Sequence, residues 1–219
     1  MFVAPRGNSV WLGALGLLCL LQVFDAVVQR DLYDAKQIEA TEKVISKNER
    51  ISAEEKQKIM DSVEERAGTT RSLVTTIVMR IVAVWLFAAL LPAGLMLFGA
   101  NFVCAGRARF VDLMSVTTFS ALVILPRELI LIPLRRATGQ LEIFVGPAAL
   151  VSSDSGLLQP FLNLFDLFEL YHLVPLALGV ALVAGISRGK AWGLVISLWV
   201  VWAMFALGAA WIALRMGAL

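Results

Sequence analysis

The chain has 219 residues, 59% of them hydrophobic, and a net charge of +2. The hydrophobic share exceeds the roughly 45–50% of ordinary soluble domains, which favours a membrane protein, and the near-neutral charge argues against a nucleic-acid partner. The two cysteines, Cys19 and Cys104, fall at different predicted depths, so we expect no disulfide framework.

Five stretches are each close to the ~20 apolar residues that a helix needs to cross a bilayer. Backbone groups inside lipid must bond within their own segment, so each stretch is predicted to be a helix. The sequence therefore predicts an all-α polytopic membrane bundle of five transmembrane helices, which forms a single domain over residues 1–219. The predicted spans are residues 11–28, 74–98, 113–134, 164–186 and 191–214.

The first span follows Arg6 and therefore shares the basic and hydrophobic order of a secretory signal peptide. Signal cleavage needs an A-x-A-like pattern of small residues, and the bulky Phe24 occupies the first such position of the triplet Phe24-Asp25-Ala26. These criteria favour an uncleaved first span over a signal peptide.

Residues 29–72 form a long polar segment with nine Lys or Arg and ten Asp or Glu. Ser52 and Glu55 have the spacing of a capping box, which predicts a helix that begins there and ends near Gly68. The segment is either a solvated spacer, which its balanced charge favours, or a helical hairpin that binds a protein partner or the membrane surface. A thin apolar stripe on the predicted helix consists of Ile59, Met60, Val63 and Ala67.

The short connections predict an orientation, because Lys and Arg are retained on the cytoplasmic side. With five spans, one side holds the N-terminal tail and the second and fourth connections, which contain Arg6, Arg107, Arg109, Arg188 and Lys190. The other side holds the balanced polar segment, and its shorter pieces contain Arg135, Arg136 and Arg215. We expect a multi-pass protein of the cell membrane with a cytoplasmic N-terminus and an external C-terminus.

Three sequence features resemble the bacterial branch of the Yip (Ypt-interacting protein) domain family. Residues 165–172 read Phe-Asp-Leu-Phe-Glu-Leu-Tyr-His and lead into a span that contains Gly179, and residues 185–191 read Gly-Ile-Ser-Arg-Gly-Lys-Ala before the last span. A basic connection with Gly106 precedes the third span, and a polar Ser-x-Glu-Glu-Lys-Gln-Lys segment follows the first. The resemblance covers almost the whole chain, and it implies five spans, a cytoplasmic N-terminus and a non-enzymatic role in membrane organisation or scaffolding.

Eukaryotic members of this family act in vesicle traffic and bind prenylated Rab-type GTPases. They have a long cytoplasmic region before the first span, whereas this sequence has about ten residues there. The resemblance therefore argues against a GTPase partner for this chain.

Charged residues inside spans are costly and mark candidate sites. Six polar residues lie at a common predicted depth toward the outer ends of the second, third and fourth spans: Arg80, Arg127, Glu128, Asp166, Glu169 and His172. Asp25 lies near the outer end of the first span. A spacing of three residues predicts a strip along one side of the fourth helix, formed by Asn163, Asp166, Glu169 and His172.

Arg127 is expected to form a salt bridge with Asp166 or Glu169, because opposite chain directions bring the third and fourth spans to similar depth there. Glu128 points about 100° away from Arg127 around the helix and is predicted to be the poorer partner. Arg80 is expected to approach the same cluster from the second span.

Two prolines lie beside these charges. Pro126 and Pro175 each remove an amide donor, which is expected to free the carbonyl groups of Leu122 and Tyr171. His172 is predicted to lie one turn deeper than the acids, in the same cleft.

Two interpretations of the cluster remain open: ion pairs that hold the bundle together, or a polar cavity near the outer leaflet that serves a transporter or lipid-handling protein. The Glu169-x-x-His172 spacing occurs in carboxylate-bridged metal sites, but those repeat it on a second helix and the chain has one histidine, so we expect no metal. The sequence contains no recognised catalytic or phosphate-binding motif, so we expect neither enzyme activity nor a cofactor. Membrane lipids are its expected partners.

Overall fold

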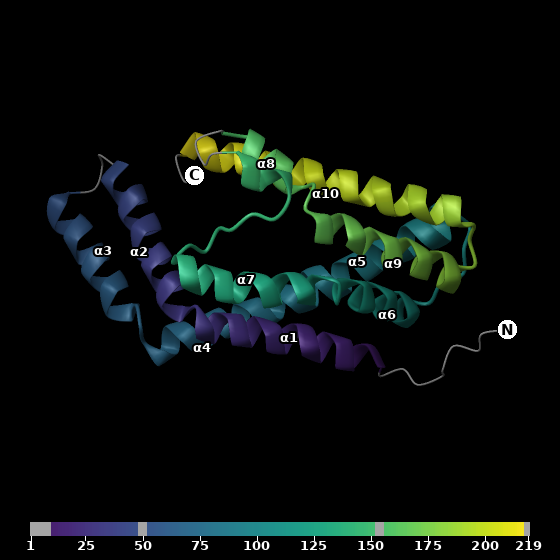
Figure 1. The fold of residues 1–219 in the computed structure, drawn as a ribbon, viewed down its shortest axis with the longest axis horizontal. Coiled ribbons are helices and arrows are strands. Elements are labelled where there is room, and N and C mark those ends of the chain that lie inside the picture. The colour runs from purple at the N-terminus through teal and green to yellow at the C-terminus, as the bar shows by residue number, and fades with distance from the viewer. Residues whose placement is uncertain (1–9, 48–51, 152–155, 217–219) are drawn as a thin grey trace.

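The computed structural model describes residues 10–47, 52–151 and 156–216, which form helices joined by turns (Figure 1). The described residues contain no strand, and the all-α prediction is confirmed. Arg6, counted above among the basic residues of the N-terminal side, lies outside these ranges.

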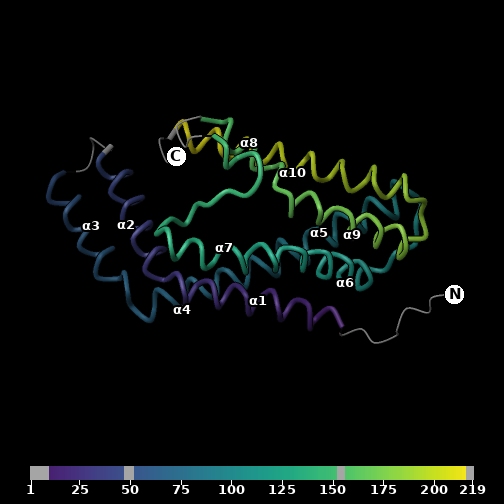
Figure 2. Tube along the Cα trace, in the orientation of Figure 1, coloured from purple at the N-terminus to yellow at the C-terminus, as the bar shows by residue number. Residues whose placement is uncertain are grey.

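Five helical stretches are long and apolar enough to cross a membrane, as the sequence predicts. Successive stretches run in opposite directions through one bundle (Figures 1 and 2). The chain is therefore a multi-pass membrane protein. The five stretches are Val10–Val28, Thr70–Val103, Phe110–Thr138, Leu167–Ala184 and Arg188–Arg215.

The two ends of the bundle differ in what they carry. At one end, called the hairpin end below, lie α2 (Arg30–Lys47) and α3 (Ala53–Arg66), and α10 (Arg188–Met216) finishes there (Figure 1). At the other end α1 (Val10–Val28) begins, and the two short connections turn the chain back (Figure 2). We call this the turn end.

The polar segment folds as a pair of helices at the hairpin end. The predicted capping box is present: the Glu55 amide donates to Ser52 Oγ at 3.3 Å, and the Ser52 amide donates to Glu55 Oε2 at 3.1 Å. α3 ends at Arg66, close to the predicted stop, and Gly68 follows with φ of +71°. α3 has no buried residue, so the helix pair keeps most of its charge in solvent.

The second span is one long helical stretch whose helix type changes three times. α4 (Thr70–Ala83) and α5 (Leu91–Phe98) are α-helical, whereas residues 84–90 and 99–103 are π-helical. The Leu91 amide bonds to the Leu86 carbonyl, one residue further back than in an α-helix. Pro92, which has no amide donor, follows directly, so the wider turn lies where the α-helical pattern loses a bond.

The third span consists of two helices and not of the single helix that the sequence predicts. α6 (Phe110–Ala121) ends, and α7 (Ile124–Thr138) begins after two intervening residues. The Leu122 carbonyl accepts the Leu125 amide at 3.0 Å, so the prediction that Pro126 frees this carbonyl is wrong. Pro126 lies in the first turn of α7, where a helix amide needs no partner within the helix.

Small side chains let the helices of the core approach closely. α6 packs against α5 and α9 (Leu167–Ala184), and α9 packs against α10. A β-carbon on Gly179 would come within 2.5 Å of the Val116 side chain, so the absence of a side chain at Gly179 lets α9 pack closely on α6. The centre of the core contains the fully or almost fully buried residues Ala89, Ala93, Ala100, Leu113, Ala177, Val180, Ala191 and Val195.

The connection between α7 and α9 folds back over the hairpin end. It contains a short 3-10 turn (Pro147–Leu150) and α8 (Leu158–Asn163), and α8 packs against α10 (Figure 1). α9 begins only after this connection, near the middle of the bundle in Figure 1. Asp166, immediately before α9, is fully buried there.

Candidate functional site

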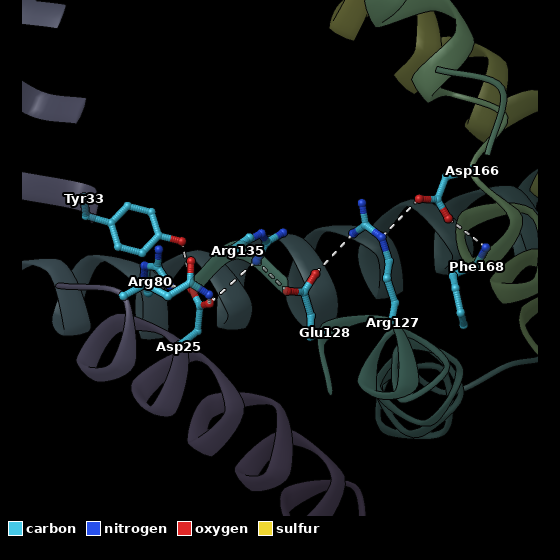
Figure 3. Close-up of polar contacts among 9 residues, drawn as sticks. Asp25, Tyr33, Arg80, Arg127, Glu128, Arg135, Asp166 and Phe168 are labelled. Carbon is cyan, nitrogen blue, oxygen red and sulfur yellow. Dashed lines mark hydrogen bonds and ion pairs between the residues drawn. The ribbon is translucent and has the colours of Figure 1, made fainter. Parts of the chain in front are cut away.

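Six charged side chains form a continuous line of ion pairs inside the bundle, called the ion chain below (Figure 3). Its first two members lie on α4 and α1, the next three on α7, and the last immediately before α9. The ion chain therefore ties four of the five spans together. In order, its members are Arg80, Asp25, Arg135, Glu128, Arg127 and Asp166.

Asp25 is the most heavily used acceptor of the ion chain. It is 5% exposed in the last turn of α1. One carboxylate oxygen accepts from Arg80 Nη1 and, at 2.8 Å, from the Tyr33 hydroxyl; the other accepts from Gln29 Nε2 and lies 3.6 Å from Arg135 Nη1. A buried carboxylate needs this number of donors to offset the loss of hydration.

Tyr33 closes the hairpin end of the ion chain from outside the spans. The Arg80 guanidinium lies 4.3 Å from the centre of the Tyr33 ring, a distance at which a cation is attracted to an aromatic face. Burial raises the pKa of the Tyr33 phenol above its ordinary value. The phenol is therefore protonated at neutral pH and can donate to Asp25.

Glu128 joins two arginines in the middle of the ion chain. Its carboxylate is 2.9 Å from Arg135 Nη1 and 3.3 Å from Arg127 Nη1. Arg127 therefore pairs with Glu128 as well as with Asp166, and its contact with Asp166, at 3.1 Å, is the shorter of the two. Arg135 lies two turns further along α7 than Glu128, on the same side of the helix, and is the closer partner of Glu128.

Arg127 and Asp166 form the predicted contact between the third and fourth spans. Arg127 Nε lies 3.1 Å from Asp166 Oδ2. Asp166 is fully buried and has a second task, because its Oδ1 accepts the Phe168 amide at 2.8 Å and caps the start of α9. One carboxylate thus both starts the fourth membrane helix and neutralises a charge on the third.

Two parts of the predicted cluster are wrong. Arg80 does not pair with the acids at the start of α9; it pairs with Asp25, which is not among the six residues of the predicted cluster. The predicted strip is also broken, because Asn163 ends α8 and Asp166 caps α9, so the two are not on one helix with His172. The spacing of three residues arises from a turn followed by a helix start.

Glu169 and His172 lie in the first turns of α9, half-buried, beside the end of the ion chain. Glu169 is within electrostatic reach of Arg127. Within the part of the chain that the structure describes, neither side chain makes a hydrogen bond. The buried Oδ1 of Asn163 also has no hydrogen-bond partner there.

Two sequence signals could have located the missed features. Asp166 followed three residues later by Glu169 has the spacing of a capping box, which marks a helix start and not a helix interior. The predicted third span stops at residue 134, which places Arg135 in a connection, but α7 includes Arg135 and continues to Thr138 before Gly139 ends it with φ of +71°. A glycine stop at residue 139 favours a longer helix that includes Arg135.

No residue of the ion chain lines either of two cavities found among the described residues. One, of about 420 Å³, lies between α2, α3 and α4; the other, of about 260 Å³, lies beside the end of α7 and the connection after it. In the described residues no group of three or more His, Cys, Asp or Glu side chains could hold a metal ion. The ion chain can neutralise charge and fix helix positions.

Comparisons with known proteins give no match: no family model, no curated protein and no solved structure is similar to this chain. Any assignment of function therefore depends on the ion chain, the cavities and the exposed helix pair. Of these, the ion chain joins the most elements.

Proposed function

We propose that this chain is a non-enzymatic scaffold that organises the bacterial inner membrane, a member of the bacterial Yip branch with a cytoplasmic N-terminus. The observation that carries the proposal is the mutual neutralisation of the ion chain, which has three arginines and three carboxylates. Charges inside a membrane protein are costly unless they are paired. Here the ion pairs connect different helices and fix their relative positions, as expected of a rigid membrane scaffold.

The helix pair α2–α3 is the surface that such a support would present. Ion pairs from Lys36 to Glu142 and from Asp31 to Arg136 join α2 to the connection after α7 and to the end of α7 itself. The Gly68 amide donates to Asp34 Oδ2 at 2.8 Å, which fastens the end of α3 to α2. A protein partner, if it binds at residues 29–72, would meet a fixed surface and not a loose spacer.

The orientation can be tested by labelling single cysteines introduced at Ser9, Ser46, Ser187 and Leu219, after the two native cysteines are replaced. We expect a membrane-impermeant maleimide to reach positions 46 and 219 in intact cells, and positions 9 and 187 only after permeabilisation. Basic residues in the short connections hold the turn end in the cytoplasm. Labelling of positions 46 and 187 from the same side would contradict the proposed arrangement of spans.

A transporter or lipid-handling role is the second candidate, and the absence of hydrogen bonds to Glu169 and His172 in the described residues favours it. Under the scaffold proposal, Glu169→Gln leaves both folded yield and retained lipid unchanged. Under the second, the variant stays folded but loses a bound lipid or solute flux. Native mass spectrometry of the purified protein and flux into proteoliposomes measure the difference, with exposed Glu64→Gln as the matched control.

Recovery of folded yield when two substitutions are combined would also favour the scaffold. Arg127→Gln removes one arginine of the ion chain and is expected to reduce folded yield. If combining it with Glu169→Gln restores yield, the two residues compensate each other electrostatically. Loss of lipid or flux at unchanged folded yield would instead remove the support for a purely structural cluster.

A further inference from the structure

The cavity between the helix pair and the second span has a lining suited to an anion. It has a volume of about 420 Å³ and lies where α3 ends and α4 begins. Its charged lining residues are Arg66, Arg71 and Asp34, and hydroxyl groups supply much of the rest. The lining therefore has an excess of one positive charge.

Both arginines of this cavity are available to a ligand. Within residues 10–47, 52–151 and 156–216, neither Arg66 nor Arg71 forms an ion pair. Asp34, the acid of the lining, is already engaged: it accepts the Gly68 amide at 2.8 Å and lies 3.8 Å from Arg30. Two guanidinium groups without a carboxylate, on opposite sides of a turn, form a binding site for a planar or tetrahedral oxyanion.

Two hydroxyl groups on α4 point to the same chemistry. Thr69, Ser72 and Thr76 fall on one face of the helix start, and all three line the cavity. The Thr69 side chain caps the helix by accepting the Ser72 amide at 3.2 Å. The half-buried hydroxyls of Ser72 and Thr76 make no hydrogen bond to any described residue, whereas Thr75 bonds the Arg71 carbonyl at 2.9 Å.

The cavity also lies at the right level for a lipid headgroup. Thr70 is the first residue of the second membrane span, and the cavity is lined from Thr69 to Thr76. The positive end of the α4 dipole faces the same place. We propose that this cavity binds a phosphate-bearing anion through Arg66, Arg71, Ser72 and Thr76, and that the phosphate is supplied by an anionic lipid headgroup. The site is distinct from the ion chain and does not depend on the scaffold role.

The binding test uses the full chain in detergent, titrated separately with phosphatidylglycerol, phosphatidylcholine and inorganic phosphate and read by native mass spectrometry. We expect phosphatidylglycerol to bind more tightly than phosphatidylcholine. The double variant Arg66→Gln, Arg71→Gln should weaken phosphatidylglycerol about thirtyfold, since each cation contributes about fivefold. The matched control, Lys56→Gln with Lys58→Gln, removes the same charge from α3 outside the cavity and should change binding by less than about twofold.

A variant that leaves the charge unchanged distinguishes specific binding of the headgroup in this cavity from nonspecific electrostatic attraction of an anionic lipid. Ser72→Ala with Thr76→Val keeps both arginines and should still weaken phosphatidylglycerol about tenfold, because hydrogen bonds to a charged phosphate are lost. Circular dichroism of each variant checks that the helices are intact. Equal loss in the lysine control, or no loss in the hydroxyl variant, would overturn the proposed site. Binding of inorganic phosphate without preference for phosphatidylglycerol would overturn the lipid as its source.

Discussion

Asp25→Asn is expected to lower the free energy of unfolding by about 3–5 kcal/mol, because it leaves the half-buried Arg80 without its carboxylate partner. Asp25 pairs with Arg80 on one side and Arg135 on the other, and it joins α1 to α4 and α7. Asparagine preserves the size of the side chain, so the effect reports the charge. The loss can be measured by reversible unfolding in mixed micelles, followed by circular dichroism.

The matched control is Asp31→Asn. Asp31 also pairs with an arginine, Arg136, at 3.1 Å, but its side chain is 75% exposed. Exposed pairs contribute about 0–1 kcal/mol, so this variant should unfold almost as the parent does. If Asp25→Asn and Asp31→Asn have equal effects, the ion chain does not stabilise the bundle.

Asp166→Asn should cost about 2 kcal/mol of unfolding free energy, since it removes the charge that faces Arg127 but keeps a side-chain oxygen for the Phe168 amide. Asp166→Ala removes both and should cost about 1 kcal/mol more, the usual worth of a helix N-cap. The difference between the two variants separates capping from charge pairing. The same unfolding measurement applies to both.

A double-mutant cycle tests the pairing directly. Arg127→Gln and Asp166→Asn, alone and combined, should give a coupling energy of about 1–2 kcal/mol, because the two side chains lie 3.1 Å apart. Arg109→Gln with Asp112→Asn provides the control cycle, as this pair is at the turn end with an exposed arginine. Additive effects of Arg127→Gln and Asp166→Asn would show that the contact contributes no stability.

The sequence predicts the spans and one long-range contact well, for physical reasons that are local. The length of each hydrophobic stretch predicts a span. The capping box depends only on Ser52 and on Glu55 three residues later, so it can be recognised from the local sequence. The pairing of Arg127 with Asp166 follows from depth, because an unpaired arginine inside a membrane is costly and only acids at that depth can neutralise it.

What the sequence does not predict is the arrangement of helices around one another. Arg80 could pair with any acid at its level, and its choice of Asp25 follows from α1 lying between α4 and α7. That neighbourhood depends on packing of small residues across the core, which hydropathy does not encode. Hydropathy also places Asp166 inside the fourth span, because its apolar neighbours continue the hydrophobic pattern, whereas in the structure Asp166 caps the start of α9.

The order of the ion chain along the sequence has a consequence for biosynthesis. Asp25 lies on the first span and Arg80 on the second, so this ion pair can form once two spans have entered the membrane. The third span then brings Arg127, Glu128 and Arg135 together, which adds one uncompensated positive charge that only Asp166 cancels. One arginine charge inside the membrane thus has no carboxylate partner until the fourth span has inserted. A nascent chain that stops after Thr138 would keep this unpaired cation and would be expected to be a substrate for membrane-protein quality control.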